Sequence, residues 1–403
     1  MAARRPARGR RVGHGRRRGV RIAPLRAVVI PPIPSTEPLL ALLEGVLDGR
    51  ESAILPVPSD VRSAELLTSS LGIGEDIDDD VAVVVSTSGT TGVPKGAMLT
   101  ARALIASASA THDRLSGPGT WLLALSAHHV AGLQVLVRSI LAGTVPVAVN
   151  PSFELDELPA AIAELGSGPR YASLVAVQLA KALGDPAATA ALAELDAVMI
   201  GGGPLPATIG EAASAAGIRV VRTYGMSETA GGCVYDGVPL DGVKVRLDDG
   251  RVVLGGETLA KGYRNPTVPD PFSESGWFRT DDVGAVDDSG VLRILGRIDD
   301  AIGTGGLTVL PQVVEAALAT HPAIADCAVF GVTDGRLGQR VTAAVVLTAG
   351  AEAPTVADLR THVARTLDST AAPREVHVVT ELPRRGIGKL DRKELADRFD
   401  TGA

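Results

Sequence analysis

The chain has 403 residues, of which 45% are hydrophobic and 3% aromatic, and its formal net charge is −7. A chain of that length is too long for one compact core, so two or three folding units are expected. A chain so rich in aliphatic residues is expected to be globular, because disordered chains are poor in them. Ten arginines lie in the first 30 residues with no acid among them, so the remainder carries a charge near −17, which argues against a nucleic-acid partner.

The Arg-rich start and the two cysteines bear on where the protein works. Residues 1–26 are expected to form a disordered extension, with a targeting peptide or a polyanion-binding arm as alternatives. A secretory signal needs a longer apolar run than Ala27–Ile30, and no stretch reaches the roughly 20 apolar residues of a membrane helix. Cys233 and Cys327 form no CxxC pair, so a cytoplasmic location is expected.

The region from residue 27 to residue 296 alternates β-branched runs with Ala/Leu-rich segments, which predicts a large α/β domain with a mostly parallel sheet. Val81–Val85 is a continuous apolar run, typical of a buried parallel strand. The other expected strands are Ala172–Val177, Ala197–Ile200 and Ile218–Val221, and the expected helices are Ala101–Thr111, Gln134–Leu141 and Ala187–Leu195.

The pattern changes twice after Gly237. Short runs separated by Asp-Gly and Ser-Gly turns predict a β subdomain, with strands at Val243–Leu247, Arg251–Leu254 and Val291–Ile294. Residues 297–403 then predict a small α+β domain of ordinary size. Its expected helices are Pro311–His321 and Thr355–Leu367, and its expected strands are Cys327–Val332 and Val341–Leu347.

A loop rich in Gly, Ser and Thr follows the Val81–Val85 strand. Its sequence is Ser86-Thr87-Ser88-Gly89-Thr90-Thr91-Gly92-Val93-Pro94-Lys95-Gly96. Glycines let backbone amides approach an anion, hydroxyl groups donate to phosphate oxygens, and Lys95 adds a positive charge. Because Lys95 lies between a proline and a glycine, the loop is not a Walker A motif. The alternative is a plain turn between a strand and a helix.

The order S-G-T-T-G-x-P-K-G resembles the signature of the acyl-adenylate-forming superfamily, which includes acyl-CoA synthetases, peptide-synthetase adenylation domains and luciferases. Further segments agree in order as far as Leu395. The resemblance implies a large adenylating domain, residues 27–296, a small mobile C-terminal domain, and ATP and Mg²⁺ as cosubstrate and cofactor. It places these loop residues at ATP: Thr87, Ser88, Gly89, Thr90, Thr91, Gly92 and Lys95.

Two more segments resemble nucleotide-binding parts of that family. Tyr224-Gly225-Met226-Ser227-Glu228-Thr229 resembles Y-G-x-T/S-E, whose glutamate holds Mg²⁺ and whose hydroxyl residue contacts the α-phosphate. Mg²⁺ favours a carboxylate combined with phosphate oxygens, which suits Glu228. Gly201–Leu205 resembles the loop against the adenine face, with Gly202 and Gly203 beside the base, although alone it is only a turn.

Trp277–Asp282 resembles W-F-x-T-G-D, whose last acid binds the ribose hydroxyls. That role falls on Asp282, while Asp281 replaces the usual glycine and puts the turn geometry in question. Gly296–Asp300 resembles the G-R-x-D-D junction between the two domains. The resemblance implies that Arg297 reaches the ribose or phosphate and that Asp299 is the hinge residue.

Two segments of the C-terminal region complete the resemblance. Gly305-Gly306 matches the loop on the coenzyme A side of the thiolation site. Pro383–Lys389 resembles P-x4-G-K, whose lysine bridges the substrate carboxylate and the α-phosphate. The expected catalytic residues are therefore Lys389 and Glu228, with Glu228 as the Mg²⁺ ligand.

Three residues are expected at the acyl substrate: His129, Arg138 and Ser173. His129 takes the place of the family's histidine beside the acyl pocket, and the alternative is a satisfied core histidine. No acidic residue lies between Trp121 and Asn150, which argues against an amino-acid substrate. Arg138 falls in an otherwise apolar helix, where a buried cation is costly unless it is paired.

Arg138 and the run Ala172–Leu179 indicate an acid with two carboxylates. That run resembles S-L-V-P-T-Q-L of o-succinylbenzoate–CoA ligases, whose substrate has one carboxylate to activate and one to hold. The alternatives for Arg138 are that it reaches the surface or pairs with a carboxylate such as Glu154. Only 85 residues precede Ser86, and this abbreviated start favours the same group.

The function that the resemblance implies is an ATP-dependent acid–CoA ligase acting through an acyl-adenylate, with o-succinylbenzoate of menaquinone biosynthesis as the expected acid. One alternative is a medium-chain or aryl acyl-CoA ligase, and another is a synthetase that passes its acyl-adenylate to a carrier protein. A non-enzymatic nucleotide-binding protein is a third. The expected small-molecule partners are the acid, ATP and coenzyme A, without nucleic acid or membrane, and a homodimer is the default assembly.

Overall fold

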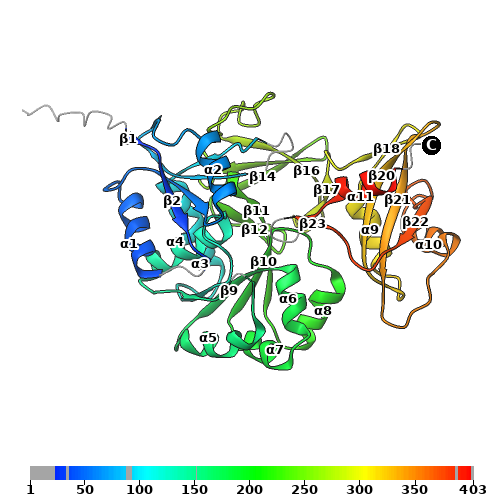
Figure 1. Ribbon diagram of the computed structural model, residues 1–403, viewed down its shortest axis with the longest axis horizontal. Coiled ribbons are helices and arrows are strands. Elements are labelled where there is room, and N and C mark those ends of the chain that lie inside the picture. The colour runs from blue at the N-terminus through cyan, green and yellow to red at the C-terminus, as the bar shows by residue number, and fades with distance from the viewer. Residues whose placement is uncertain (1–22, 33–35, 88–92, 151, 386–388, 401–403) are drawn as a thin grey trace, which may run out of the picture.

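Two sheets with helices between them form the larger part of the molecule, and a smaller α+β domain follows toward the C-terminus (Figure 1). The computed structural model describes residues 23–32, 36–87, 93–150, 152–385 and 389–400. The predicted fold class is confirmed: a large α/β domain, a β subdomain and a small α+β domain. No helix in these ranges combines the length and the hydrophobicity that crossing a membrane requires.

The central sheet of the large domain has seven strands in the order β13-β12-β11-β10-β9-β7-β8. Strands β11, β10, β9, β7 and β8 run parallel to their neighbours, and β12 and β13 are antiparallel at one edge. The bounds are β7 Thr120–Leu123, β8 Val147–Ala148, β9 Arg170–Val175, β10 Ala197–Gly201, β11 Val220–Met226, β12 Gly231–Tyr235 and β13 Val238–Pro239.

Side chains alternate between the two faces of this sheet, as the strand period requires. Trp121 and Leu123 pack toward helices α3 and α4, whereas Leu122 between them packs toward α5 to α8. Figure 1 shows α5 to α8 gathered on one side of the central strands. The bounds are α3 Ala101–Arg114, α4 Val130–Ala142, α5 Leu158–Glu164, α6 Ala176–Leu183, α7 Pro186–Ala193 and α8 Ala207–Ala215, with a 3₁₀ turn η1 at Leu155–Glu157.

The second sheet, in the order β2-β3-β5-β6, packs on the other side of α3 and α4. All five residues of β5 are buried, which explains its unbroken run of apolar residues. The bounds are β2 Arg26–Ile30, β3 Ile54–Pro58, β5 Val81–Val85, β6 Ala97–Thr100, α1 Thr36–Leu47 and α2 Val61–Ser70.

The expected boundary of the Arg-rich extension is wrong by a few residues. β1 (Ala23–Pro24) pairs with β4 (Asp76–Ile77), and Arg26 begins β2 opposite Ile54. Residues 23–26 therefore belong to the folded large domain because their backbone is paired, and residues 1–22 lie outside the described ranges.

An antiparallel sheet of four strands, β14-β15-β16-β17, forms the predicted β subdomain. Its last strand reaches Arg297, which pairs with Asp282 of β16, so the large domain extends one residue past the expected boundary at 296. The bounds are β14 Val243–Asp248, β15 Arg251–Gly256, β16 Trp277–Val286 and β17 Leu292–Arg297.

The C-terminal domain joins the end of β17 and builds its own core around one sheet (Figure 1). Strands β19-β18-β21-β20 are antiparallel, and β22 adds in parallel to β21. The bounds are β18 Ile302–Thr304, β19 Leu307–Val309, α9 Pro311–Leu318, β20 Ile324–Asp334, β21 Gly338–Leu347, α10 Val356–Val363, β22 Glu375–Val378, β23 Arg384–Arg385, β24 Lys389–Leu390 and α11 Arg392–Phe399.

An ion-pair network inside this domain ties α11 to α9 and to the hinge segment. Arg392 donates both Nη2 hydrogen bonds to Glu315, at 2.8 and 2.7 Å, and its Nη1 lies 3.2 Å from Asp300. Burial raises the pKa of Glu315, and Arg392 opposes that shift. The segment that carries Lys389 is therefore fixed to α9 through a residue three positions further along the chain.

Replacement Arg392→Ala is expected to destabilise the C-terminal domain by about 3 kcal/mol, because Glu315 is left buried without its cation. Urea unfolding measures this, with Lys393→Ala as a control since Lys393 is exposed on the same helix. Equal stability of the two variants would contradict the structural role of the pair.

Candidate functional site

The motif residues of the large domain collect at the carboxyl edge of the central sheet. β10 and β11 are parallel neighbours, and Gly202 and Gly203 follow the first while Ser227 and Glu228 follow the second. Ligands bind at this edge in open α/β sheets because the parallel strands all end there. Gly202 adopts a positive φ of 80°, which glycine accommodates without strain.

Gly225 lies near the end of β11, just before the turn that carries Glu228. A Cβ on Gly225 would lie 2.1 Å from the carbonyl oxygen of Gly231, so only glycine fits between β11 and β12. The chain then makes a single 3₁₀ turn, η2 (Ser227–Thr229), closed by Ala230 in the left-handed conformation. The glycine that the motif carries at this position therefore has a steric reason.

The loop Ser86–Gly96, called the phosphate loop here after its expected role, is described at its two ends. Thr87 follows β5, and its Oγ1 is buried with no hydrogen-bond partner among the described residues. Lys95 lies at the other end, with its Nζ 5.3 Å from the centroid of the Tyr263 ring. Ser88, Gly89, Thr90, Thr91 and Gly92 lie outside the described residues. A buried hydroxyl without a partner among the described residues and a lysine in the same loop fit a segment that receives an anionic oxygen.

Glu228 is buried, with 8% of its surface exposed, and one carboxylate oxygen is engaged. Tyr263 Oη donates to Glu228 Oε1 at 2.5 Å. No donor in the described part of the chain contacts Oε2, and no group of three or more His, Cys, Asp or Glu side chains gathers there to hold a metal unaided. A single carboxylate with one free oxygen fits Mg²⁺, which takes the rest of its ligands from phosphates and water.

Asp282 lies on β16 with both carboxylate oxygens engaged. Tyr224 Oη donates to Oδ2 at 2.6 Å, and Arg297 Nη1 lies 3.4 Å from Oδ1. Burial raises the pKa of Asp282, and the hydrogen bond from Tyr224 and the charge of Arg297 oppose the shift. The ribose residue named by the sequence therefore contacts two other predicted site residues, Tyr224 and Arg297.

Arg297 links the large domain to the hinge. It makes a bidentate contact with Asp299, at 2.8 and 2.7 Å, and lies 3.6 Å from Asp281. The turn geometry that Asp281 left in question is resolved: this residue lies in the middle of β16, where its carboxylate also forms an ion pair with Arg251. A carboxylate at this position therefore joins an ion-pair network and needs no special backbone conformation.

The C-terminal residues occupy two tight hairpins. Gly305 and Gly306, with φ of 58° and 82°, form the two-residue loop between β18 and β19, the geometry that favours two glycines. The backbone of Lys389 lies opposite that of Arg385 in the antiparallel β23–β24 hairpin, and residues 386–388 lie outside the described ranges. In the view of Figure 1 this hairpin extends from the small domain in the direction of the large one.

His129 stands at the start of α4, where it is the N-cap residue. Its ring lies tilted by 46° against that of His128, with centroids 4.0 Å apart, and His128 Nδ1 lies 2.6 Å from Ser126 Oγ. Burial, followed by the neighbouring His129, lowers the pKa of His128 to about 4, so this imidazole is neutral at pH 7. The two histidines therefore lie at the N-terminal end of α4, in the connection that follows the carboxyl end of β7.

Arg138 lies two turns further along α4, buried between this helix and the central sheet. Only 2% of its surface is exposed, and its guanidinium carbon lies 4.7 Å from the centroid of the Trp121 ring. Nη1 lies 3.5 Å from Ser173 Oγ and 3.9 Å from the sulfur of Met199, while Nε has no hydrogen-bond partner. Burial lowers the pKa of Arg138.

Both alternatives for Arg138 are wrong. The side chain does not reach the surface, and no carboxylate within the described ranges, Glu154 included, forms an ion pair with it. Arg138 and Ser173, both expected at the acyl substrate, lie together in the structure, with Nη1 3.5 Å from Oγ. A buried guanidinium with an unused donor and weak neutral partners is a position where a bound anion would be stabilised.

Two aromatic residues complete the site and were not predicted from the sequence. The ring of Trp121 contacts the guanidinium of Arg138, and the hydroxyl of Tyr263 donates a hydrogen bond to Glu228. In a chain with 3% aromatic residues each Trp and Tyr is itself a signal, and Tyr263 lies in a Lys-Gly-Tyr segment close to the predicted site motifs in the sequence. Their partners are distant in sequence, so only the fold reveals the contacts.

Comparison with known protein families agrees with this geometry. The family of AMP-binding enzymes matches residues 47–263, and the AMP-binding enzyme C-terminal domain matches residues 313–389. The chain belongs to the AMP-binding enzyme family, as the motifs predicted. Its match covers the elements that carry Lys95, Glu228 and Tyr263.

Individual relatives are more specific. The chain is 66% identical over 380 residues to the probable 2-succinylbenzoate–CoA ligase of Mycobacterium tuberculosis, covering 93% of this chain and 98% of that protein. It is 32% identical to the 2-succinylbenzoate–CoA ligase of Geobacillus kaustophilus, over 88% and 76% of the two chains. The fold is similar to that of o-succinylbenzoate CoA synthetase from Bacillus subtilis in complex with its acyl-adenylate intermediate, with a TM-score of 0.76, 24% identity and coverage of 93% and 88%.

Replacement Arg138→Met is expected to raise the free energy of unfolding of the ligand-free protein by about 1 kcal/mol, because it removes a buried charge that has no counter-ion. Arg114→Met is the matched control. Arg114 donates to the carbonyls of Tyr235, Val238 and Pro239, so its loss should destabilise. Chemical denaturation measures both, and a larger loss at Arg138 than at Arg114 would show that Arg138 is structural.

Proposed function

We propose that the protein is a 2-succinylbenzoate–CoA ligase of menaquinone biosynthesis, which activates its acid with ATP and transfers the acyl group to coenzyme A. The observation that carries the proposal is Arg138, a buried guanidinium without a carboxylate partner in the described part of the chain. A substrate with a second carboxylate supplies the missing charge. The relatives that cover nearly the whole chain bear this enzyme's name, which supports the same substrate.

In the first half-reaction one carboxylate oxygen of the acid attacks the α-phosphorus of ATP and pyrophosphate leaves. Negative charge accumulates on the phosphate oxygens, so catalysis depends on cations placed beforehand. Lys95 and the hydroxyl of Thr87 face the phosphates, Asp282 holds the ribose hydroxyls, and Lys389 bridges the carboxylate and the α-phosphate. Glu228 would hold Mg²⁺, which would supply positive charge to the phosphate oxygens.

In the second half-reaction the thiol of coenzyme A attacks the acyl carbon and AMP leaves. The small domain turns about Asp299, which withdraws Lys389 and brings Gly305 and Gly306 to the thiol. Arg297 makes a bidentate contact with Asp299 within the segment that joins the two domains, so this contact lies where the rotation takes place.

The two cysteines support the expected cytoplasmic location. Cys233 and Cys327 are both free and buried, and burial raises the pKa of Cys233 to about 12, so its thiol is unreactive. A reducing cytoplasm suits such thiols and is part of the proposal. The homodimer remains a prediction.

Pyrophosphate release in the presence of ATP and Mg²⁺ tests the proposal across a panel of acids: o-succinylbenzoate, benzoate, octanoate and amino acids, each with and without coenzyme A. Release with o-succinylbenzoate alone, and a coenzyme A thioester as the product, is expected. Release with benzoate or octanoate would overturn the substrate and leave a general acyl-CoA ligase. An adenylate that coenzyme A does not discharge would favour a carrier-protein acceptor.

Replacement Lys389→Ala is expected to lower adenylation by roughly a thousandfold, because the charge that develops on the α-phosphate loses its cation. The same variant should convert a pre-formed acyl-adenylate to the thioester at a rate close to that of the unmodified enzyme. Single-turnover assays of each half-reaction separate the two. Loss of both half-reactions would contradict the role given to Lys389.

Replacement Arg138→Met is expected to raise KM for o-succinylbenzoate roughly a hundredfold, since a charge-assisted contact to the second carboxylate is lost. The KM of the enzyme for ATP should not change, and a methyl ester of the second carboxylate should lose its disadvantage against the free acid. Equal effects of the replacement on the acid and its ester would remove Arg138 from the acyl pocket.

A further inference from the structure

The segment from Ala260 to Asn265, called the strap here, runs between the phosphate loop and the turn that carries Glu228. The backbone N–H of Ala260 donates to the carbonyl of Glu228 at 2.8 Å. The remaining strap contacts follow the arm that leaves the phosphate loop: Lys261 N to Met98 O at 2.9 Å, Met98 N to Gly262 O at 2.9 Å, Arg264 N to Gly96 O at 2.8 Å and Asn265 N to Lys95 O at 2.9 Å. The strap thus bonds both nucleotide-binding elements.

Tyr263 sits in the middle of the strap and touches both elements with its side chain. Its hydroxyl donates to Glu228 Oε1 at 2.5 Å, and its ring lies 5.3 Å from Lys95 Nζ. The edge-on packing of Phe272, with ring centroids 5.4 Å apart, fixes the plane of the tyrosine. One side chain therefore spans the expected metal-binding carboxylate and the expected phosphate-binding cation.

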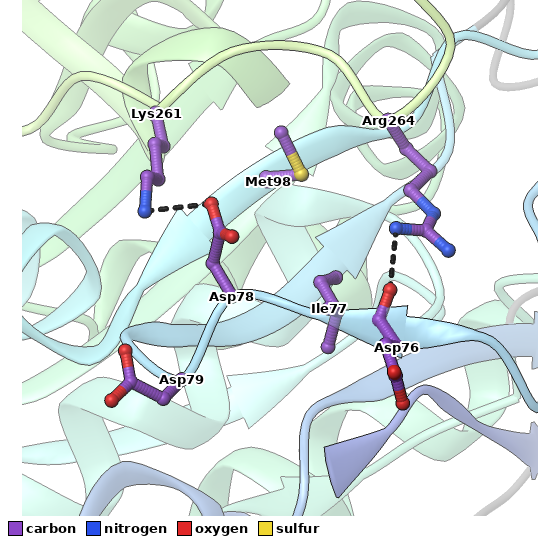
Figure 2. A pocket seen from close by; sticks show the side chains of 7 residues that line it. All are labelled: Asp76, Ile77, Asp78, Asp79, Met98, Lys261 and Arg264. Atoms are coloured by element: carbon purple, nitrogen blue, oxygen red, sulfur yellow. Dashed lines mark hydrogen bonds and ion pairs between the residues drawn. The ribbon is translucent and has the colours of Figure 1, made fainter. Parts of the chain in front are cut away.

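Charged side chains on either side of Tyr263 anchor the strap to the loop between β4 and β5. Lys261 pairs with Asp78 and Asp80, each at 2.7 Å, and Arg264 bonds the carbonyl of Asp76 at 2.9 Å. Figure 2 shows the contacts of Lys261 with Asp78 and of Arg264 with Asp76 in the pocket that Asp76, Ile77, Asp78, Asp79, Met98, Lys261 and Arg264 line. The strap is therefore held by ion pairs before Tyr263 and by a side-chain hydrogen bond after it.

A further contact closes the strap at its end. The side-chain amide of Asn265 donates to the carbonyls of Pro94 and Ser70, both at 2.8 Å. Pro94 precedes Lys95, so the strap holds the backbone on both sides of the lysine. The arrangement leaves little freedom for Lys95 and Glu228 to move independently.

We infer that Tyr263 is a positioning residue that sets the distance and orientation of Glu228 and Lys95 for Mg²⁺ and the ATP phosphates. This inference rests on the proposed function, which gives Glu228 the metal and Lys95 the phosphates. The hydroxyl occupies Oε1 and turns Oε2 toward the metal, as outer-shell partners do for metal ligands. The ring face attracts the ammonium of Lys95 and so limits where that charge lies.

The inference is tested by the binding of α,β-methylene-ATP, a non-reactive analogue, by isothermal titration calorimetry with Mg²⁺ and with a chelator. The ratio of the two dissociation constants measures what the metal contributes, and no turnover is involved. Tyr263→Phe keeps the ring and removes the hydroxyl, so it should lower this ratio by roughly tenfold. Tyr263→Leu should lower it similarly and also weaken the metal-free binding, because Lys95 loses the ring.

Two variants separate the possible outcomes. Tyr171→Phe removes another tyrosine hydroxyl, one that donates to Gly117 O at 2.9 Å, and should keep the ratio of the unmodified protein. Glu228→Gln should bring the ratio close to one. If Glu228→Gln brings the ratio close to one while Tyr263→Phe keeps the ratio of the unmodified protein, the positioning role of Tyr263 is wrong. If Glu228→Gln itself has no effect, the metal role in the proposed function is wrong instead.

Discussion

A cation enclosed without a counter-ion is the constraint around which the acyl end of this protein is built. Arg138 lies between α4 and the central sheet, in contact with an aromatic face, a hydroxyl and a thioether. These neighbours reduce the unfavourable free energy of burying the charge but do not remove it. The helix and the sheet around it form one large apolar core, which supplies the stability needed to keep the guanidinium in place. Under the proposed function, the substrate supplies the counter-charge that the chain withholds.

The nucleotide end is organised in the opposite way, with most charges already paired. Asp282 contacts Tyr224 and Arg297, Glu228 contacts Tyr263, and Arg297 also contacts Asp299. Preorganised dipoles and charges need little rearrangement when charge develops on a substrate, which suits phosphoryl chemistry. Under the proposed function, the same contacts lead from the large domain to the hinge. The site would then combine a preorganised nucleotide end with an acyl end whose cation has no carboxylate partner in the described part of the chain.

Much of the fold followed from the sequence, because local rules dominate there. The buried run of β5 and the Ala-rich helices were predicted at nearly their observed positions, and the hairpin at Gly305 and Gly306 has the backbone that two glycines favour. The geometry at Asp281 stayed open because its environment is set by Arg251 and Arg297 from other strands. Tyr263 was missed for the same physical reason: its contact with Glu228 joins residues 35 positions apart. Sequence patterns specify elements, while such pairings depend on tertiary packing.

The most direct test of the account compares two non-hydrolysable acyl-adenylate analogues of o-succinylbenzoate, one with its second carboxylate free and one with that carboxylate methylated. Both share every contact to the nucleotide end, so the difference in their dissociation constants isolates the interaction with the buried cation. The account predicts that the free acid binds at least roughly tenfold more tightly, as a charge-assisted contact requires. Equal affinities would contradict the claim that Arg138 is kept unpaired for the substrate.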